Sequence, residues 1–330
     1  MTIDKDNIAE YLNARHLFPV PLGTEYTVEA LGGGFLNTVL RVQAGEHALV
    51  VKQALDALRL FPDLKVTTDR IVFERKALEV LNRFFPDGTV PPIIHFDDDN
   101  RVLVMGDLGR KPSVEQSLIE GRVNPETAER LGTFLAELHR RTFDDPVLRA
   151  EFNNEGMQSL RLQYCFYFLS DPALLDAARR LGQRFTQEKR VLLHADFWTA
   201  SVMADDTRIH VFDLEFAYYG HPSQDIGFMM AHYLLHARNT PHLAGSVVTA
   251  VRRLWTAYVQ GMAHRLLADA ERAALQQAGV EMLFRIDGIN RVKYVTDDAA
   301  RVRIRAFASR LILDDQMTVE RMCALGSSSS

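Results

Sequence analysis

The stretch HADFWTASVMADDTRIHVFDLEF, residues 194–216, places acidic side chains among apolar residues that are typical of a protein core. The carboxylates concerned are Asp196, Asp213 and Glu215, and Phe212 and Phe216 flank the last two. Burying an unpaired charge is costly, so such carboxylates need a partner that neutralises them. The stretch therefore predicts a functional site rather than ordinary core.

A hairpin explains how these carboxylates come together. Residues 202–203 and 209–212 are strand-like and flank a polar turn at 205–207. Pairing of the two strands returns the chain to the loop that begins at Asp196. Asp196 is then expected beside a reacting hydroxyl, while the two later carboxylates face a hard cation such as Mg²⁺, which prefers oxygen ligands. Without a cation, three carboxylates in one pocket would repel one another.

The chain before this stretch reads as a small antiparallel sheet with one helix. Strand-like runs are separated by glycine-containing turns, and an apolar stripe of helical period follows them with Thr67 or Thr68 as N-cap. The expected elements are a helix over 1–17, strands over 26–31, 35–43 and 47–53, a helix over 67–84, and a hairpin over 91–108.

Beyond residue 108 the pattern becomes helical, with one strand-like interruption at 190–213. The sequence predicts an α+β class with a sheet lobe over 1–108 and a larger helical lobe over 109–325. The tail GSSSS, 326–330, reads as disordered or as foreign to the natural protein. Helices are expected over 125–141, 155–169, 172–188, 225–238, 243–266 and 297–313.

Composition excludes several classes of protein. The 330 residues are 47% hydrophobic and 25% charged, and no stretch approaches the roughly 20 apolar residues of a membrane span. A net charge of −5 gives no reason to expect a nucleic-acid partner. The first residues lack a secretory pattern, so a cytoplasmic protein without a membrane partner is expected. Cys165 and Cys323 lie in apolar helical patterns and are expected to be reduced packing thiols.

Three motifs carry a resemblance to a known family: His194-Ala195-Asp196 with Ser201, then Asp213-Leu214-Glu215, then Asp225-Ile226-Gly227. Together they resemble the catalytic core of the aminoglycoside phosphotransferase and protein-kinase-like superfamily, and within it the 5-methylthioribose kinases. The resemblance extends over about residues 25–300. It implies a bilobal protein-kinase-like fold that transfers the γ-phosphate of ATP to a hydroxyl, with ATP and Mg²⁺ as cofactors.

For the N-terminal lobe the resemblance implies nucleotide binding. Lys52 matches the lysine that contacts the α- and β-phosphates, and Glu74 matches its ion-pair partner. By itself a Lys–Glu pair is more often an exposed ion pair on the surface, but the apolar residues before Lys52 favour a buried lysine. A triple glycine such as the one at 32–34 is by itself more often a simple turn. The stretch 105–109 can be interpreted almost equally well as a linker as a nucleotide-binding segment. The further nucleotide-binding candidates are Gly32, Gly33, Gly34, Asn37, Met105, Asp107 and Ser201.

For the C-terminal lobe the resemblance implies that Asp196 is the catalytic residue, which accepts or orients the proton of the acceptor hydroxyl. Asp213 is expected to bind Mg²⁺ directly, with Glu215 assisting. His194 is expected to hold the loop by hydrogen bonds. Asp225 is expected to be the N-cap of the following helix and to brace the loop.

The acceptor is the least determined part of the site. Where 5-methylthioribose kinases present two adjacent arginines, the comparable stretch here is taken as 288–295, with Arg291 as the substrate-contact candidate and solvation on a helix surface as an equal alternative. The first hypothesis is a kinase for the anomeric hydroxyl of 5-methylthioribose or a related 5-deoxy pentose. The alternatives are an aminoglycoside-type antibiotic phosphotransferase and a non-catalytic nucleotide-binding pseudokinase. The resemblance also implies a homodimer.

Overall fold

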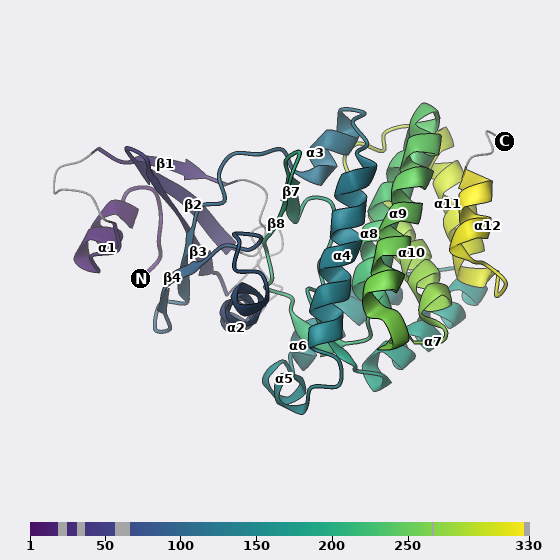
Figure 1. Cartoon of the computed structure of the whole chain (residues 1–330), viewed down its shortest axis with the longest axis horizontal. Coiled ribbons are helices and arrows are strands. Elements are labelled where there is room, and N and C mark those ends of the chain that lie inside the picture. The colour runs from purple at the N-terminus through teal and green to yellow at the C-terminus, as the bar shows by residue number, and fades with distance from the viewer. Residues whose placement is uncertain (19–24, 32–36, 57–66, 266, 327–330) are drawn as a thin grey trace. The chain divides into compact units, whose positions relative to one another are not determined.

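The computed structural model of the chain describes residues 1–18, 25–31, 37–56, 67–265 and 267–326 (Figure 1). Contacts divide the chain into two compact units. The first unit comprises Met1–Arg110 and His210–Glu215, and the second comprises Lys111–Ile209 and Phe216–Ser330. An antiparallel N-terminal sheet followed by a mostly helical remainder confirms the predicted α+β class.

The first unit is built on a five-stranded antiparallel sheet. Its strands, in spatial order, are β1 (Thr27–Ala30), β2 (Asn37–Ala44), β3 (His47–Ala54), β5 (Val102–Gly106) and β4 (Ile93–Asp97). The turn between β2 and β3 contains Gly45 at φ +58°, a left-handed conformation that glycine adopts without a steric penalty. The three strands and the hairpin expected from the sequence are therefore present.

The two faces of this sheet have different roles. Helix α1 (Ile8–Ala14) packs with Leu40, Val51 and Val104 in one apolar cluster. Successive side chains of a strand point to opposite faces, so Lys52, next to Val51, points away from α1. Helix α2 (Arg70–Phe84) supplies its partner on that face, because Nζ of Lys52 lies 2.7 Å from Oε2 of Glu74.

The second unit is mainly helical (Figure 1). Helices α4 and α9 pack closely: a Cβ at Gly132 on α4 would lie 2.2 Å from the carbonyl oxygen of Leu254 on α9, so only glycine fits there. The elements are α3 (Val114–Ile119), α4 (Pro125–Arg141), α5 (Pro146–Glu151), α6 (Glu155–Arg161), a π-helical turn η1 (Leu162–Phe166), α7 (Pro172–Gln187), β6 (Val191–Leu193), β7 (Val202–Ala204), β8 (Ile209–Val211), β9 (Tyr218–Gly220), α8 (Ser223–Asn239), η2 (Pro241–Leu243), α9 (Ala244–Met262), η3 (Ala263–Arg265), α10 (Ala270–Asp287), α11 (Asp298–Leu313) and α12 (Val319–Gly326).

The predicted hairpin around residues 205–207 is confirmed by the pairing of β7 with β8. The helix expected over 155–169 differs: α6 ends at Arg161 and continues as the π-helical turn η1. Helix α10 was not predicted, because it is buried on nearly every side and so lacks the polar face that marks an amphipathic helix.

Two further predictions concern the cysteines and the absence of a membrane-spanning helix. Cys165 and Cys323 are both buried and neither forms a disulfide, as predicted for packing thiols. Within the described part of the chain, no helix combines the length and the apolar character needed to cross a bilayer.

Acid sensitivity of the second unit is expected at His221, which has no exposed surface. Burial, followed by the nearby charge of Arg184, lowers the pKa of His221 from 6.5 to about 3. Its Nδ1 accepts a 3.2 Å hydrogen bond from the backbone N–H of Ser223, a bond that requires this nitrogen to be unprotonated. Below pH 6.5 the unfolded state therefore binds a proton at His221, whereas the folded state binds it only near pH 3.

The stabilisation from a neutral His221 is thus present above pH 6.5 and is lost as the pH falls toward 3, by up to about 5 kcal/mol. We expect His221→Gln to unfold at a less strongly pH-dependent temperature between pH 6.5 and 4, as measured by circular dichroism. His242→Gln, at an exposed position, is the control and should keep the wild-type slope. Equal slopes in all three proteins would contradict this assignment.

Candidate active site

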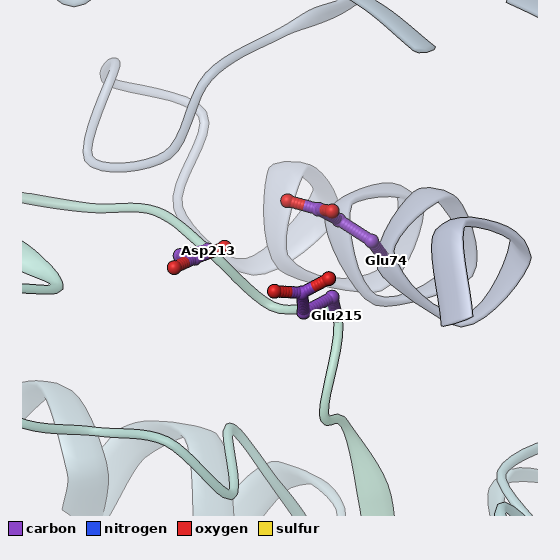
Figure 2. A group of neighbouring side chains, drawn as sticks. All are labelled: Glu74, Asp213 and Glu215. Atoms are coloured by element: carbon purple, nitrogen blue, oxygen red, sulfur yellow. The ribbon is translucent and has the colours of Figure 1, made fainter. Parts of the chain in front are cut away.

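The first unit contains a cluster of three carboxylates (Figure 2). The buried ammonium group of Lys52 contacts two of them. Glu74 comes from α2, and Asp213 and Glu215 come from the segment after β8; one oxygen of each lies within 4.8 Å of the others. Nζ of Lys52 lies 2.7 Å from Oε2 of Glu74 and 2.5 Å from Oδ1 of Asp213. The predicted Lys–Glu pair and the predicted metal-binding pair therefore form one cluster.

The electrostatics of this cluster are unbalanced. Burial would lower the pKa of Lys52, but the charges of Asp213, Glu215 and Glu74 raise it above its ordinary value. Burial raises the pKa of Glu74 and of Glu215, and repulsion from Asp213 adds to both shifts. Burial is the largest cause of these raised pKa values, and the ammonium group of Lys52 does not offset it.

Asn37 and Arg70 hold Glu215 in place. Oε2 of Glu215 accepts a 2.7 Å bond from Nδ2 of Asn37 and a 3.2 Å bond from Nε of Arg70. Arg70 is fully buried and also donates to the carbonyl oxygens of Thr67 and Leu55 at 2.7 and 2.8 Å. Asn37, a nucleotide-binding candidate from the sequence, thus has a bracing contact, and Arg70 was missed by sequence reasoning.

The donor set of the cluster fits a hard divalent cation. The cluster combines Lys52 and Arg70 with three carboxylates, so a negative charge remains after pairing. Carboxylate oxygens are the ligands that Mg²⁺ prefers in phosphate-binding sites. Asp213 is also held at φ +69°, a conformation that an aspartate adopts at some cost and that is frequent at functional sites.

The other nucleotide-binding candidates of the first unit have varied positions. Gly32, Gly33 and Gly34 lie outside the described residues. Met105 is a buried residue of β5 that pairs in register with Val50. Oδ2 of Asp107 accepts bonds of 3.0 and 2.8 Å from Nε and NH2 of Arg41, so its side chain is occupied.

In the second unit, Asp196 lies in a loop closed by its own hydrogen bonds. The carbonyl oxygen of Asp196 accepts a 2.9 Å bond from Oγ of Ser201 and a 3.1 Å bond from the N–H of Trp198. Nδ1 of His194 accepts a 3.3 Å bond from the N–H of Asp196. Ser201, a nucleotide-binding candidate from the sequence, fixes the backbone of this loop with its buried hydroxyl.

Asp225 braces the same loop from helix α8. Its two oxygens accept 2.8 Å bonds from the backbone N–H groups of His194 and Ala195, and Nε2 of His139 lies 3.3 Å away. The N-cap prediction was wrong, because α8 begins at Ser223 and Asp225 lies inside its first turn. Bracing, the second part of that prediction, agrees with these contacts. Ala195 stands at φ +64°, a left-handed conformation that is uncommon for residues other than glycine.

Removing the charge of Asp225 is expected to loosen this loop. In Asp225→Asn one backbone N–H faces an amide group that cannot accept, and a charge-assisted bond of this kind contributes about 1.5–3 kcal/mol. We expect a lower unfolding temperature together with a lower turnover. Asp176→Asn, at an exposed site of α7, is the control for thermal unfolding. An unchanged unfolding temperature in Asp225→Asn would remove the bracing role.

The comparison with known families agrees with this geometry. Residues 27–274 match the phosphotransferase enzyme family (APH), which is most of the chain. The chain belongs to this family. The family resemblance expected from the sequence motifs is therefore confirmed.

Two methylthioribose kinases are similar to this chain in sequence. That of Yersinia pseudotuberculosis serotype O:3 (strain YPIII) is 30% identical over 252 residues, which cover 66% of this chain and 61% of that protein. That of Geobacillus sp. (strain WCH70) is 27% identical over 346 residues, which cover 88% of this chain and 86% of that protein. The chain thus spans about three fifths of the length of the methylthioribose kinase of Yersinia pseudotuberculosis.

A solved structure with a similar fold is that of amicoumacin kinase in complex with AMP-PNP, Ca²⁺ and Ami. The TM-score is 0.55 at 15% sequence identity, and the match covers 96% of this chain and 95% of that one. At this identity the similarity concerns the fold alone, and it agrees with the protein-kinase-like fold implied by the sequence motifs.

Two buried arginines lie near Asp196, and sequence reasoning missed both. NH2 of Arg161 lies 2.6 Å from Oδ1 of Asp196. Nε of Arg285 lies 2.6 Å from Oε1 of Glu281, one helical turn earlier on α10, and its Cζ lies 4.6 Å from the Trp198 ring centroid. Neither arginine belongs to a recognisable motif, so the only available signal was a charge inside an apolar helix.

Around these arginines several buried polar atoms have no hydrogen-bond partner among the described residues. His232 has neither ring nitrogen bonded, since its Nε2 lies 3.6 Å from Glu281, which is longer than a hydrogen bond. Burial lowers the pKa of His232, so its ring is neutral. The other unpartnered atoms of this neighbourhood are Nε of Arg161, Oε2 of Glu281, Nε2 of His236 and the hydroxyl of Tyr294.

Arg291 differs from Arg285 in its exposure and in its contacts. Arg291 is exposed, and its guanidinium donates at 3.2 and 3.4 Å to the carbonyl oxygens of Gly288 and Asp287 at the end of α10. The described contacts therefore agree with the alternative that left it on the helix surface. Arg285, six residues earlier, is instead buried and paired with Glu281.

Proposed function

We propose that this phosphotransferase transfers the γ-phosphate of ATP to a hydroxyl of a small molecule, and that the acceptor is 5-methylthioribose or a related 5-substituted or 5-deoxy pentose. The observation that carries the phosphotransfer proposal is the buried Lys52, paired with Glu74 and Asp213. The acceptor proposal is supported by the sequence similarity to methylthioribose kinases.

Nucleotide binding is assigned to the N-terminal lobe, residues 1–108. Lys52, fixed by Glu74, would contact the phosphate oxygens of ATP. Asp213, with Glu215 assisting, would hold Mg²⁺, and Glu215 is kept in position by Asn37. When bound, Mg²⁺ supplies charge neutralisation of the triphosphate. The solved complex of an amicoumacin kinase with AMP-PNP and Ca²⁺ supports this assignment at the level of the fold.

Catalysis and acceptor binding are assigned to the C-terminal lobe, residues 109–325. Asp196 would take the proton of the acceptor hydroxyl, and the bonds from Asp225 to the loop would keep its backbone in place. Phosphoryl transfer needs both sets of groups in one reacting complex. The presence of Lys52, Asp196 and Asp213 together argues against a non-catalytic pseudokinase.

The charges near Asp196 favour a neutral acceptor over a polycationic antibiotic. An aminoglycoside needs carboxylates that are free to pair with its ammonium groups. Asp196 is already paired with Arg161, and Glu281 with Arg285. The unpartnered groups of His232 and its neighbours are instead suited to hydroxyls, which both donate and accept. Within this proposal Arg285 replaces Arg291 as the arginine that contacts the acceptor.

An acceptor screen tests the proposal. Purified protein with Mg-ATP would be given 5-methylthioribose, 5-deoxyribose, ribose, kanamycin and streptomycin, and products would be detected by mass shift and by ³¹P NMR. We expect a phosphorylated 5-substituted pentose, with the phosphate on the anomeric carbon. Transfer to an aminoglycoside alone would favour the antibiotic phosphotransferase. Tight ATP binding without transfer to any acceptor would favour the pseudokinase. The predicted homodimer and cytoplasmic location stay predictions.

A further inference from the structure

Arg161 has an unusual place in the chain. It is the last residue of α6, and the π-helical turn η1 (Leu162–Phe166) follows at once. A π-helical turn inserts one extra residue per turn and so changes the direction in which neighbouring side chains point, and such turns are frequent at functional sites. The side chain of Arg161 retains only 7% of its exposed surface, so the chain has buried a permanent charge here.

The surroundings of this guanidinium are aromatic on two sides and ionic at one end. Cζ of Arg161 lies 4.5 Å from the ring centroid of Phe228 and 5.5 Å from that of Phe216. NH2 lies 2.6 Å from Oδ1 of Asp196. The buried Nε has no hydrogen-bond partner among the described residues. Packing between rings removes the rotational freedom of the guanidinium, so its contact with Asp196 has a fixed direction.

Only one oxygen of Asp196 is occupied by this contact. Oδ1 is bound to Arg161, whereas Oδ2 has no hydrogen bond to any described residue, and the carboxyl group keeps 18% of its surface exposed. A carboxylate with one oxygen anchored and the other open is arranged to receive a single hydroxyl proton in a defined direction.

We propose that Arg161 is a positioning residue for the phosphotransfer reaction: it holds Oδ1 of Asp196 and thereby directs Oδ2 to the acceptor hydroxyl. This inference rests on the proposed function. As the acceptor oxygen bonds to the γ-phosphorus, its proton passes to Oδ2. The bond from the γ-phosphorus to the β,γ-bridging oxygen breaks, and ADP leaves with that electron pair.

Two cations from different elements face the carboxylate. Arg161 contacts it from the end of α6, and Arg285 on α10 adds a second positive charge nearby. The other titratable groups around them include His194 in the same loop, Cys165 on η1, Tyr218 on β9, His232 on α8 and Glu281 on α10, and Glu281 is paired with Arg285. Among the described residues, Arg161 is the cation that contacts Asp196, so its loss removes the contact that orients this carboxylate.

Arg161→Met and Arg161→Lys test the inference, with Arg180→Met at an exposed site of α7 as the control. In 5-methylthioribose phosphorylation, Arg161→Met is expected to lower kcat by about 100-fold, the cost of a misplaced catalytic group. KM for ATP should stay within about twofold, because the nucleotide groups lie elsewhere. Arg161→Lys should restore kcat in part, because an ammonium group can contact Oδ1 but lacks the planar fork of a guanidinium.

Several results would overturn the inference. An unchanged kcat in Arg161→Met, or a loss confined to KM for the acceptor, would show that Arg161 does not orient Asp196. Circular dichroism checks that the variant is folded. If the wild-type protein does not phosphorylate 5-methylthioribose, the proposed acceptor fails, and the orientation is tested separately by a crystal structure of Arg161→Met. An Asp196 side chain with the same rotamer in that crystal would refute positioning by Arg161.

Discussion

Replacing Asp196 with asparagine is expected to lower kcat by about 10²- to 10⁴-fold, the usual contribution of a positioned acid–base group. The amide keeps the shape of the side chain but cannot take up the acceptor proton. Its backbone bonds to Ser201 and Trp198 do not involve the side chain, so the loop should keep its conformation. Binding of ATP, assigned to the first unit, should persist.

Two measurements separate these effects. Steady-state phosphorylation of 5-methylthioribose gives kcat, and isothermal titration with Mg-AMP-PNP gives nucleotide affinity. Asp206→Asn, at the exposed turn between β7 and β8, is the matched control and should retain wild-type rates. A near-wild-type rate in Asp196→Asn would withdraw the catalytic assignment.

Local sequence patterns predicted a large part of the fold. The helix over 125–141 coincides with α4, because Asn124 accepts hydrogen bonds from the first turn and Pro125 occupies its first position. The pairing of β7 with β8 followed from strand-like residues around a polar turn. These signals are local, so they survive without knowledge of the tertiary structure.

Local sequence patterns did not predict helix α10 or the turn η1, for two different reasons. Burial of α10 on nearly all sides removes the polar–apolar contrast on which the helical period depends. The turn η1 continues the helical pattern of α6, so nothing in the residues at 162–166 marks the change of register. In both cases tertiary packing decides the conformation.

The candidate site divides in the same way. Lys52 and Glu74 were found because they match the ion pair of the family that the sequence resembles, and the apolar residues before Lys52 favoured a buried lysine. Arg70, Arg161 and Arg285 were missed because each pairs with a carboxylate far away in sequence or within a buried helix, and only the three-dimensional structure shows the pair. Arginine is common on helix surfaces, so its residue type alone carries little information.

Replacing Asp213 with asparagine is expected to weaken Mg-nucleotide binding by at least about 10- to 100-fold, the loss already seen when an outer partner of a metal ligand is removed. Turnover should fall with it. Asparagine tolerates the positive φ of +69° at this position, so the backbone need not change. The protein without nucleotide should be as stable as the wild type or more so, because Asp213 repels the buried Glu74 and Glu215.

This combination distinguishes a ligand of the cation from a residue that only supports the fold. Thermal unfolding would be followed with no addition, with ATP and EDTA, and with Mg-ATP. Wild-type protein and Asp99→Asn, an exposed control in the first unit, should gain stability with Mg-ATP, whereas Asp213→Asn should gain little. A variant that unfolds early without nucleotide yet keeps the full Mg-ATP shift would show that Asp213 stabilises the unit through Lys52 and does not hold the cation.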